Sequence, residues 1–304
     1  MSVLGQHENA QLDHAYAICR GVTRSSAKNF YYAFLVMPKE KRNALCAVYA
    51  FMRHADDLSD DATQPLEQRW QKLEAWREQF HQAMQGHATD DPVLFALADA
   101  QQRFKIPVEL FDQLVQGTMM DLQQSAAGAP LTFATFDDLS RYCYHVASVV
   151  GLISIRIFGY KDPAAEPLAE RTGIAFQLTN IIRDVREDAL MGRVYLPEDD
   201  LARFGRSPAE LAPALLGNGF QAAVWADILR FEADRARELY RAADDLIPLI
   251  DEDCQPALWT LVTIYRRLLD KIALKQYDVF RERVRLTVPE KLKILGKGFV
   301  RRLA

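Results

Sequence analysis

Apolar residues recur at intervals of three and four along most of the chain, the spacing that places them on one face of an α-helix. In residues 41–58 the apolar positions are Ala44, Leu45, Val48, Phe51, Met52 and Ala55. In residues 170–191 they are Ile174, Phe176, Leu178, Ile181, Ile182 and Val185. The same spacing predicts helices over residues 66–84, 107–120, 136–158, 220–246 and 255–279. The pattern therefore predicts about eight helices or more.

The segments between these helices are short and contain turn-forming residues. The chain has 304 residues but only 14 Gly and 13 Pro, and these gather in the breaks instead of recurring regularly as in a β-sandwich. No internal repeat, low-complexity tract or long linker is present. We therefore expect an all-α fold, with residues 1–304 forming a single domain.

Charge and composition exclude several classes of protein. The net charge of −4 gives no basic footprint for a nucleic acid partner. The four cysteines are scattered and form no closely spaced pair, so neither a disulfide framework nor a zinc site is predicted. The start of the chain lacks the pattern of a secretory signal, and the longest apolar stretch, residues 146–159, is shorter than the ~20 residues that span a bilayer. We expect a cytoplasmic protein without a transmembrane helix.

The first candidate for chemistry is the acidic segment HADDLSDD at the end of the helix predicted over residues 41–58. It carries Asp56, Asp57, Asp60 and Asp61. Asp56 and Asp60 are four residues apart and lie on one helical face. Their charges repel one another, and the negative end of the helix dipole adds to that repulsion. Mg²⁺ would reverse it, since this ion binds one or two carboxylates together with water and phosphate oxygens. A solvated acidic helix end is the alternative.

A second acidic stripe lies in QLTNIIRDVREDALMGRVYLPEDDL. Asn180, Asp184 and Asp188 follow one another at four-residue spacing on one face of an otherwise apolar helix, which indicates a lined cavity. Nearby cations that could bind diphosphate oxygens are Arg183, Arg186 and Arg193. The alternative is charge pairing on an exposed helix, such as Arg183 with Glu187.

Two acidic stripes that face one another across a helical bundle could hold Mg²⁺ ions and a diphosphate. Such ions stabilise a departing diphosphate where negative charge develops. An allylic diphosphate would leave a carbocation, which needs a dry apolar pocket, and aromatic faces can stabilise its charge.

Five blocks of the chain resemble the squalene/phytoene synthase family, in the order in which the family has them. They are SSAKNFYYAFLVMP (25–38), NALCAVYAFMRHADDLSD (43–60), YCYHVASVVGL (142–152), QLTNIIRDVREDALMGRVYLPEDDL (177–201) and IYRRLLDKI (264–272). The fourth block is the most specific, because its Asn, Arg, two spaced acids and GRVYLP form a family signature. Asn29 departs from the pattern, since many relatives have Ser or Thr there.

The resemblance implies the isoprenoid synthase fold, an all-α, single-domain helical bundle around a central cavity. The positions that match Mg²⁺ and diphosphate ligands are Asp56, Asp60, Asn180, Asp184 and Asp188. Those that match other contacts to the substrate are Lys28, Tyr49, Arg53, Tyr265 and Arg283, to which the cation Arg183 is added. Tyr142 resembles the family tyrosine near the cyclopropyl intermediate, where it assists proton removal or stabilises a cation.

The reaction implied by the resemblance is the head-to-head, or 1'-1, condensation of two prenyl diphosphates. Phe34 resembles the bulky residue of thirty-carbon synthases, and RNALCAVY resembles squalene synthases. Both features favour two farnesyl diphosphates, which give presqualene diphosphate and then squalene with NADPH as the reductant. The alternative is a phytoene synthase that uses two geranylgeranyl diphosphates.

Other classes stay open on the residues alone. A terpene cyclase would share the metal site, but its second motif would be an Asn/Ser/Glu triad. A nucleotide pyrophosphatase would need no large apolar cavity, and a non-catalytic helical prenyl-binding or scaffold protein would have a broken acidic motif. The basic, amphipathic segment LKILGKGFVRRLA suggests peripheral contact with a membrane, with a solvated terminal helix as the alternative. The oligomeric state is not set by the sequence.

Overall fold

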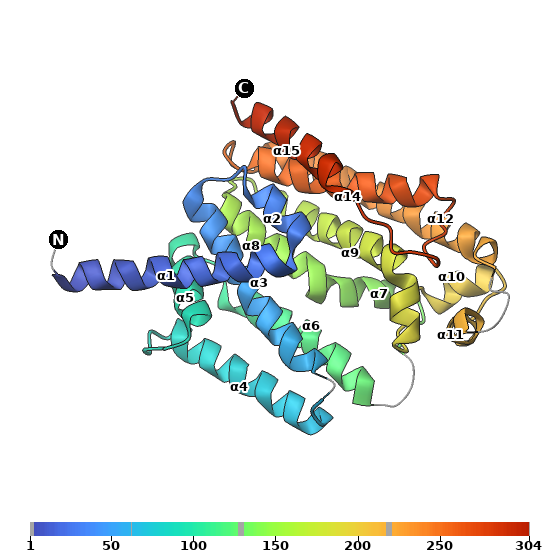
Figure 1. Cartoon of the computed structure of the whole chain (residues 1–304), viewed down its shortest axis with the longest axis horizontal. Coiled ribbons are helices and arrows are strands. Elements are labelled where there is room, and N and C mark those ends of the chain that lie inside the picture. The colour runs from blue at the N-terminus through green and yellow to red at the C-terminus, as the bar shows by residue number, and fades with distance from the viewer. Residues whose placement is uncertain (1–2, 62, 127–130, 217–220, 304) are drawn as a thin grey trace.

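The chain folds into helices joined mostly by short turns (Figure 1). The computed structural model describes residues 3–61, 63–126, 131–216 and 221–303, without the side chains of residues 3–8, 28, 29, 124–126, 302 and 303. The first helices are α1 (Val3–Ser26), α2 (Lys28–Phe34), α3 (Lys39–Asp60), α4 (Leu66–Met84), α5 (Pro92–Phe104), α6 (Val108–Ala126), α7 (Phe136–Cys143), the π-helical turn η1 (Tyr144–Ser148) and α8 (Val149–Phe158). The remaining helices are α9 (Ala165–Leu190), α10 (Glu198–Arg203), α11 (Pro208–Leu216), α12 (Ala223–Leu239), α13 (Arg241–Leu246), the 3₁₀ turn η2 (Ile247–Leu249), α14 (Gln255–Leu274) and α15 (Val288–Leu303).

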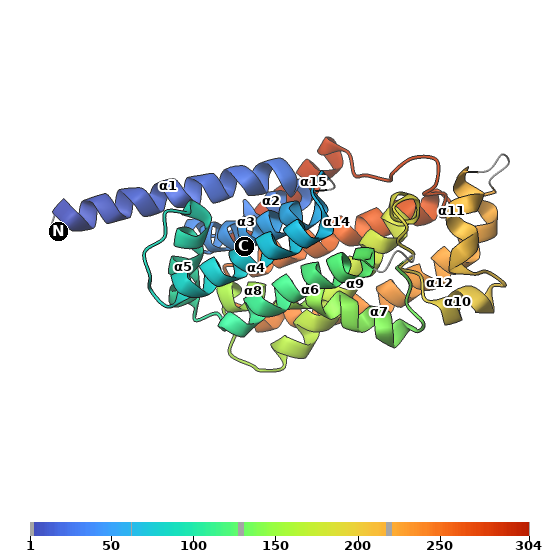
Figure 2. The same cartoon turned by 90° about the horizontal axis from the view of Figure 1, so that it is seen from below.

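Two long helices, α3 and α9, organise the bundle. Helix α3 packs against α1, α5 and α6, whereas α9 packs against α8, η1, α12 and α14. Figure 1 shows α4 and α6 on one side of these helices and α14 and α15 on the other, and both Figure 1 and Figure 2 show the start of α1 projecting beyond the bundle. The functional candidates on α3 and α9 therefore lie in the interior of an all-α fold, as the sequence predicts.

Aromatic packing joins α3 to its neighbours at the core. Phe51 stacks on Trp76 of α4 at a centroid distance of 5.6 Å and meets Phe111 of α6 edge-on at 5.8 Å. Each such side chain contributes about 1.5–3 kcal/mol when it is fully buried. The buried apolar residues form a cluster that extends from Ala15 to Leu295. This shared core holds both acidic segments in fixed positions.

Most predicted helices are confirmed, and two need correction. The helix predicted over residues 220–246 divides at Tyr240 into α12 and α13, where Arg266 binds the Tyr240 carbonyl oxygen at 2.6 Å. The helix predicted over residues 255–279 ends at Leu274, because Gln276 and Tyr277 adopt positive φ angles of 53° and 61°. The apolar spacing did not predict helices α1, α2, α5, α10 and α11.

The π-helical turn η1 interrupts the helix predicted over residues 136–158 without ending it. It packs against α9 at Gly173, where an added Cβ would lie 2.6 Å from the Cα atom of Ser148. The Ser148 hydroxyl donates to the Glu170 carbonyl oxygen at 2.7 Å. This position therefore requires glycine for the two backbones to approach.

A buried cluster of charged groups fixes α10 to α12. Asp200 and Glu232 are each only 1% exposed. Arg235 donates to Asp200 Oδ2 at 2.7 Å and to both Glu232 oxygens at 2.9 Å, and its guanidinium lies 4.0 Å from the centre of the Phe136 ring. Burial raises the pKa of Glu232 to about 7, although the Arg235 charge opposes this shift. The cluster holds the segment that follows α9.

Candidate active site

An apolar cavity runs between the central helices. Side chains of α2, α3, α8, α9, α13 and α14 line it. The apolar lining includes Phe34, Leu45, Val150, Phe158, Phe176 and Leu258. Polar side chains that interrupt this lining include Tyr49, Gln177 and Asn180. The cavity can therefore take a hydrocarbon chain and offers polar groups where that chain would end.

A second cavity, the basic cavity, adjoins the apolar one. Both are lined by Phe30, Tyr49 and Asn180. Cationic side chains that line the basic cavity are Arg183, Arg283, Arg285 and Lys291. Tyr265 also lines it, and its ring lies 4.7 Å from that of Phe176. An anionic head group and an apolar tail would fit across this junction.

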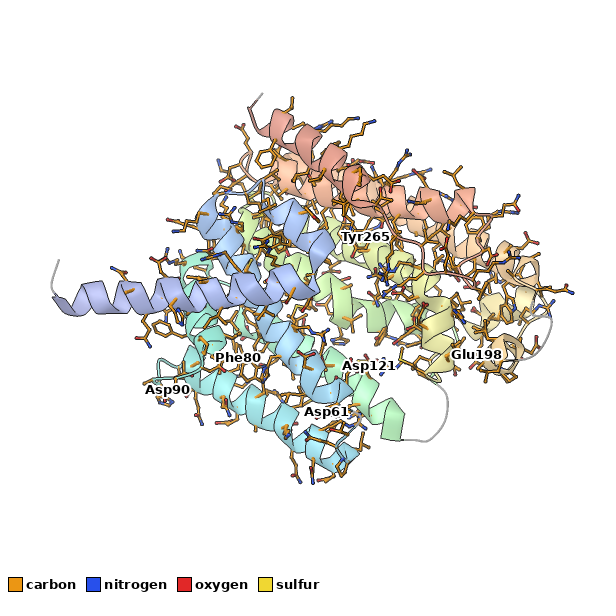
Figure 3. All side chains as sticks on the ribbon, viewed as in Figure 1. Asp61, Phe80, Asp90, Asp121, Glu198 and Tyr265 are labelled. Carbon is orange, nitrogen blue, oxygen red and sulfur yellow. The ribbon has the colours of Figure 1, made fainter. Side chains whose placement is uncertain are left out.

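A third cavity, the tyrosine cavity, lies on the other side of the apolar one. It is lined by Asp56, Asp121 and Tyr142, and it shares Met52, Val146 and Gln177 with the apolar cavity. Figure 3 labels Tyr265 on the α14 side of the bundle and Asp121 on the α6 side. The apolar cavity therefore adjoins a polar region on α6 as well as one on α14.

The first acidic segment lies at the end of α3, as the sequence predicts. Burial, followed by the charge of Asp60, raises the pKa of Asp56 to about 7. Arg53 pairs with the exposed Asp57, one helical turn away. Asp60 lies 3.8 Å from Arg193. The inner carboxylate of this segment is thus destabilised by its neighbours, which is the condition that a bound cation relieves.

On α9, Asn180, Asp184 and Asp188 share one face. Arg283 donates to both Asp184 oxygens at 2.7 Å, and Arg183 pairs with the same carboxylate. Burial would raise the pKa of Asp184, but the two arginines outweigh it and lower this pKa. Burial and the Asp184 charge raise the pKa of Asp188 to about 7. Arg183 therefore pairs with Asp184, and the alternative interpretation of the sequence, a pair of Arg183 with Glu187 on an exposed helix, does not hold.

Arg193 connects the two acidic segments. Besides its contact with Asp60, its charge lowers the pKa of both Asp121 and Asp188 against the effect of burial. The segment around it is held by two backbone bonds, from Leu131 N to Gly192 O at 2.9 Å and from Val194 N to Leu131 O at 2.8 Å. The two stripes thus face a common space, whereas Arg186 lies on the exposed side of α9.

The donor set of the two segments fits Mg²⁺. Carboxylate and amide oxygens are the hard ligands that this ion prefers. Within the described ranges, no three His, Cys, Asp or Glu side chains form a ready metal cluster. Two separate carboxylate groups agree with the way Mg²⁺ binds, through one or two carboxylates from the protein and phosphate oxygens from the substrate.

Tyr142 has two partners that the sequence reasoning missed. Its hydroxyl donates to Asp121 Oδ2 at 3.2 Å and lies 3.4 Å from the Tyr195 hydroxyl. Burial raises the pKa of Asp121 to about 6. The sequence did contain a sign of Asp121, because this acidic residue shares one helical face with Leu114 and Thr118. Tyr195 lies in the fourth block that resembles the family, residues 177–201, but the sequence analysis gave it no role.

The other predicted residues divide between the cavities. Phe34 is 7% exposed, lines the apolar cavity and contacts the Phe30 ring at 6.3 Å. Tyr49 lines both the apolar and the basic cavity, and Arg53 lies one turn further along α3. Lys28 begins α2, but its side chain lies outside the described ones.

Comparison with known proteins agrees with this arrangement. The sequence model of the squalene/phytoene synthase family matches residues 23–290. A 15-cis-phytoene synthase of Synechococcus elongatus is 36% identical over 96% of this chain and 94% of its own length. A phytoene synthase of Mycobacterium tuberculosis is 38% identical over 93% and 90%.

Solved structures of the same family share the fold. A crystal structure of a dehydrosqualene synthase superposes with a TM-score of 0.83 at 31% identity, over 96% of this chain and 97% of that one. A squalene synthase of Alicyclobacillus acidocaldarius gives 0.76 at 28% identity, over 88% and 96%. Members of this family join prenyl diphosphates head to head. The chain therefore belongs to the squalene/phytoene synthase family of prenyltransferases.

Proposed function

We propose that this chain joins two geranylgeranyl diphosphates to form phytoene, in a reaction that requires Mg²⁺. The main support for a prenyl diphosphate substrate is that the apolar and basic cavities meet at Phe30, Tyr49 and Asn180. The twenty-carbon chain is supported by the relatives named phytoene synthase. This choice places the alternative of the sequence analysis ahead of its preferred farnesyl diphosphate.

The residues that would hold Mg²⁺ are Asp56, Asp60, Asn180, Asp184 and Asp188. Bound there, Mg²⁺ would supply positive charge to the departing diphosphate. Arg183 and Arg283 present forked donors beside the same space and would bind diphosphate oxygens. Lys28 and Tyr265 are further candidates for binding diphosphate oxygens. Arg53, one turn beyond Tyr49 on α3, is another.

The apolar cavity would protect the allylic cation that forms when diphosphate leaves. Its hydrocarbon walls exclude water, and the ring faces of Phe30 and Phe176 can stabilise positive charge. The C1 cation alkylates the C2=C3 bond of the second substrate, and loss of a proton closes the cyclopropane ring. Tyr142 could accept this proton while it passes its own to Asp121. A second ionisation, rearrangement and proton loss then give phytoene without a reductant.

Farnesyl diphosphate is the second candidate because of Phe34. This buried ring occupies one wall of the apolar cavity and would restrict a longer chain. With farnesyl diphosphate the first product would be presqualene diphosphate, and squalene would then require a hydride from NADPH.

The test is incubation of the purified chain with Mg²⁺ and radiolabelled geranylgeranyl or farnesyl diphosphate, with and without NADPH. Phytoene from the longer substrate is the expected product. Presqualene diphosphate or squalene from the shorter one would instead establish the second candidate. Absence of product from both substrates in the presence of Mg²⁺ would favour a non-catalytic prenyl-binding protein.

The role of Phe34 is tested separately with Phe34→Leu, which shortens the side chain while keeping the site apolar. We expect the ratio of kcat/KM for the longer to the shorter substrate to rise about tenfold, the scale of one or two methylenes in an apolar pocket. Phe95→Leu on α5 serves as the control, because the Phe95 side chain is partly buried but lines none of the cavities. Equal changes in the two variants would exclude a specific role of Phe34.

A further inference from the structure

Helix α15 packs on the bundle through one face only. Ile294 and Leu295 are buried, and an added Cβ at Gly298 would lie 2.3 Å from the Thr260 hydroxyl of α14. Glu290 accepts from Lys271 of α14 at 2.9 Å. These contacts fix the rotation of α15 about its own axis, and therefore fix which of its residues face outward.

The outward side of α15 is unusually apolar. Val288, Leu292, Phe299 and Val300 are 57%, 51%, 40% and 66% exposed. They are four of the ten large apolar side chains that are exposed in the described part of the chain. Exposed residues gathered in this way on one helix mark a surface that contacts another apolar phase. Leu274 of α14, one turn from Lys271, is a further exposed apolar side chain, 81% exposed.

Basic residues border the apolar ones. Lys293, Lys297 and Arg301 recur at four-residue spacing and are all exposed. The helix carries five Lys or Arg residues and one Glu, so its net charge is +4 in a chain of net charge −4. An amphipathic helix with exposed apolar residues beside a basic stripe binds anionic lipid surfaces.

We infer that α15 docks this protein on an anionic lipid bilayer. The basic stripe complements anionic head groups, and Leu292, Phe299 and Val300 enter the boundary with the acyl chains. A symmetric contact between two copies would instead bring the same positive helix against itself. Lys291, on the neighbouring face of α15, lines the basic cavity. Docking would therefore bring the opening of that cavity close to the lipid surface. The inference is independent of the length of the prenyl substrate.

The test is co-sedimentation of the full chain with phosphatidylcholine vesicles, with and without phosphatidylglycerol. We expect strong binding only to the anionic vesicles, and weaker binding at high salt because salt screens the attraction. Each basic residue near an anionic surface contributes about fivefold to binding. The double variant Lys293→Gln/Lys297→Gln should therefore bind about 25-fold more weakly.

A second variant, Leu292→Ser/Phe299→Ser, tests the apolar contribution and should weaken binding about tenfold or more. Val224→Ser/Arg241→Gln removes an exposed apolar and an exposed basic residue from α12 and α13, and should bind as the unchanged chain does. Thermal unfolding shows that each variant folds, and product formation in detergent should be unchanged because none of these residues lines a cavity.

Equal binding to neutral and anionic vesicles would overturn the inference, as would undiminished binding of the two-lysine variant. Sedimentation velocity without lipid gives a further decisive outcome. If the unchanged chain self-associates, loses this association in Leu292→Ser/Phe299→Ser and does not bind vesicles, then the outward side of α15 is a contact between two copies.

Discussion

Two groups of buried carboxylates in this molecule differ in what neutralises them. Asp200 and Glu232 share one arginine, Arg235, which donates to both. In the two acidic segments, the strongest neighbouring charge on Asp56 is that of another carboxylate, Asp60, and the strongest on Asp188 is that of Asp184. The first group is paired within the fold, and the second is arranged so that an added cation would stabilise it.

A raised pKa does not distinguish these two groups. The pKa of Glu232 and that of Asp56 are both raised to about 7, in each case chiefly by burial. The difference lies in location, since Asp56 lines a cavity and Glu232 packs inside the protein. A perturbed carboxylate therefore becomes a functional candidate only where it faces a space that a ligand can enter.

The largest expected effect comes from Arg235→Met. Loss of the guanidinium leaves the buried Glu232 without a cation and Asp200 with only the exposed Arg203, 3.1 Å away, which costs about 3–5 kcal/mol of unfolding free energy. Urea unfolding measures this change. The control is Arg237→Met, because Arg237 pairs with the exposed Asp234 and its loss should cost less than about 1 kcal/mol. Similar costs for both variants would show that Asp200 and Glu232 do not depend on Arg235.

The opposite behaviour is expected of Asp56→Asn and Asp188→Asn. Each should lower kcat/KM by about 10²–10³, since each removes charge that stabilises the departing diphosphate through Mg²⁺. Neither should lower the thermal unfolding temperature, because each removes a repulsive buried charge. Asp57→Asn, on the exposed side of the same turn, is the control. A large loss of stability in the two site variants would contradict the division into two groups.

A smaller effect is expected of Asp121→Asn. This change should lower kcat by about 10²-fold, which is the typical cost of losing a proton acceptor. The KM for each substrate should change little, because Asp121 is separate from the basic cavity. Steady-state kinetics separates the two quantities. Glu109→Gln, an exposed change on the same helix, provides the comparison. An increase in KM at constant kcat would instead place Asp121 in substrate binding.

The smallest effect concerns the pH dependence of stability. Because the folded state raises the pKa of Glu232 to about 7, folded protein binds the proton more tightly than unfolded protein does. The contribution of this group is complete at acidic pH and is lost as pH rises through about 7. Glu232→Gln should therefore gain about 2 kcal/mol relative to the unchanged chain between pH 5.5 and 8, because roughly 1.5 pH units of that range lie below the raised pKa of Glu232. A gap in unfolding free energy that stays constant with pH would mean that Arg235 keeps Glu232 ionised throughout.

The parts of the site that follow helical spacing were predictable from sequence. Asp56 and Asp60, and Asn180 with its two aspartates, share a face because four residues make about one turn. The pairing of Arg283 with Asp184 joins positions 99 residues apart, and no local rule specifies it; the family resemblance alone indicated Arg283. Asp121 was missed because its importance comes from the approach of α6 to Tyr142.

The same distinction applies to the fold. The apolar repeats of α3 and α9 predicted both helices to within a few residues, since each has a wide buried face. The end of α12 was missed because Arg266 of α14 binds the Tyr240 carbonyl oxygen, which is a tertiary contact. Tertiary contacts thus account for what local pattern did not reveal in both the fold and the site.

The π-helical turn Tyr144–Ser148 lets this helix hold one extra residue without turning its far end. A π turn contains one residue more than an α turn, and it lies between Tyr142 of the tyrosine cavity and Val150 of the apolar cavity. Deletion of one residue here would leave a regular α turn and keep Val150 at nearly the same rotation about the helix axis, whereas deletion of one residue from α8 would rotate everything beyond it by about 100°. Descendants of this sequence can therefore lose one codon within η1 more readily than one in α8, where the loss would turn one wall of the substrate cavity away from the other.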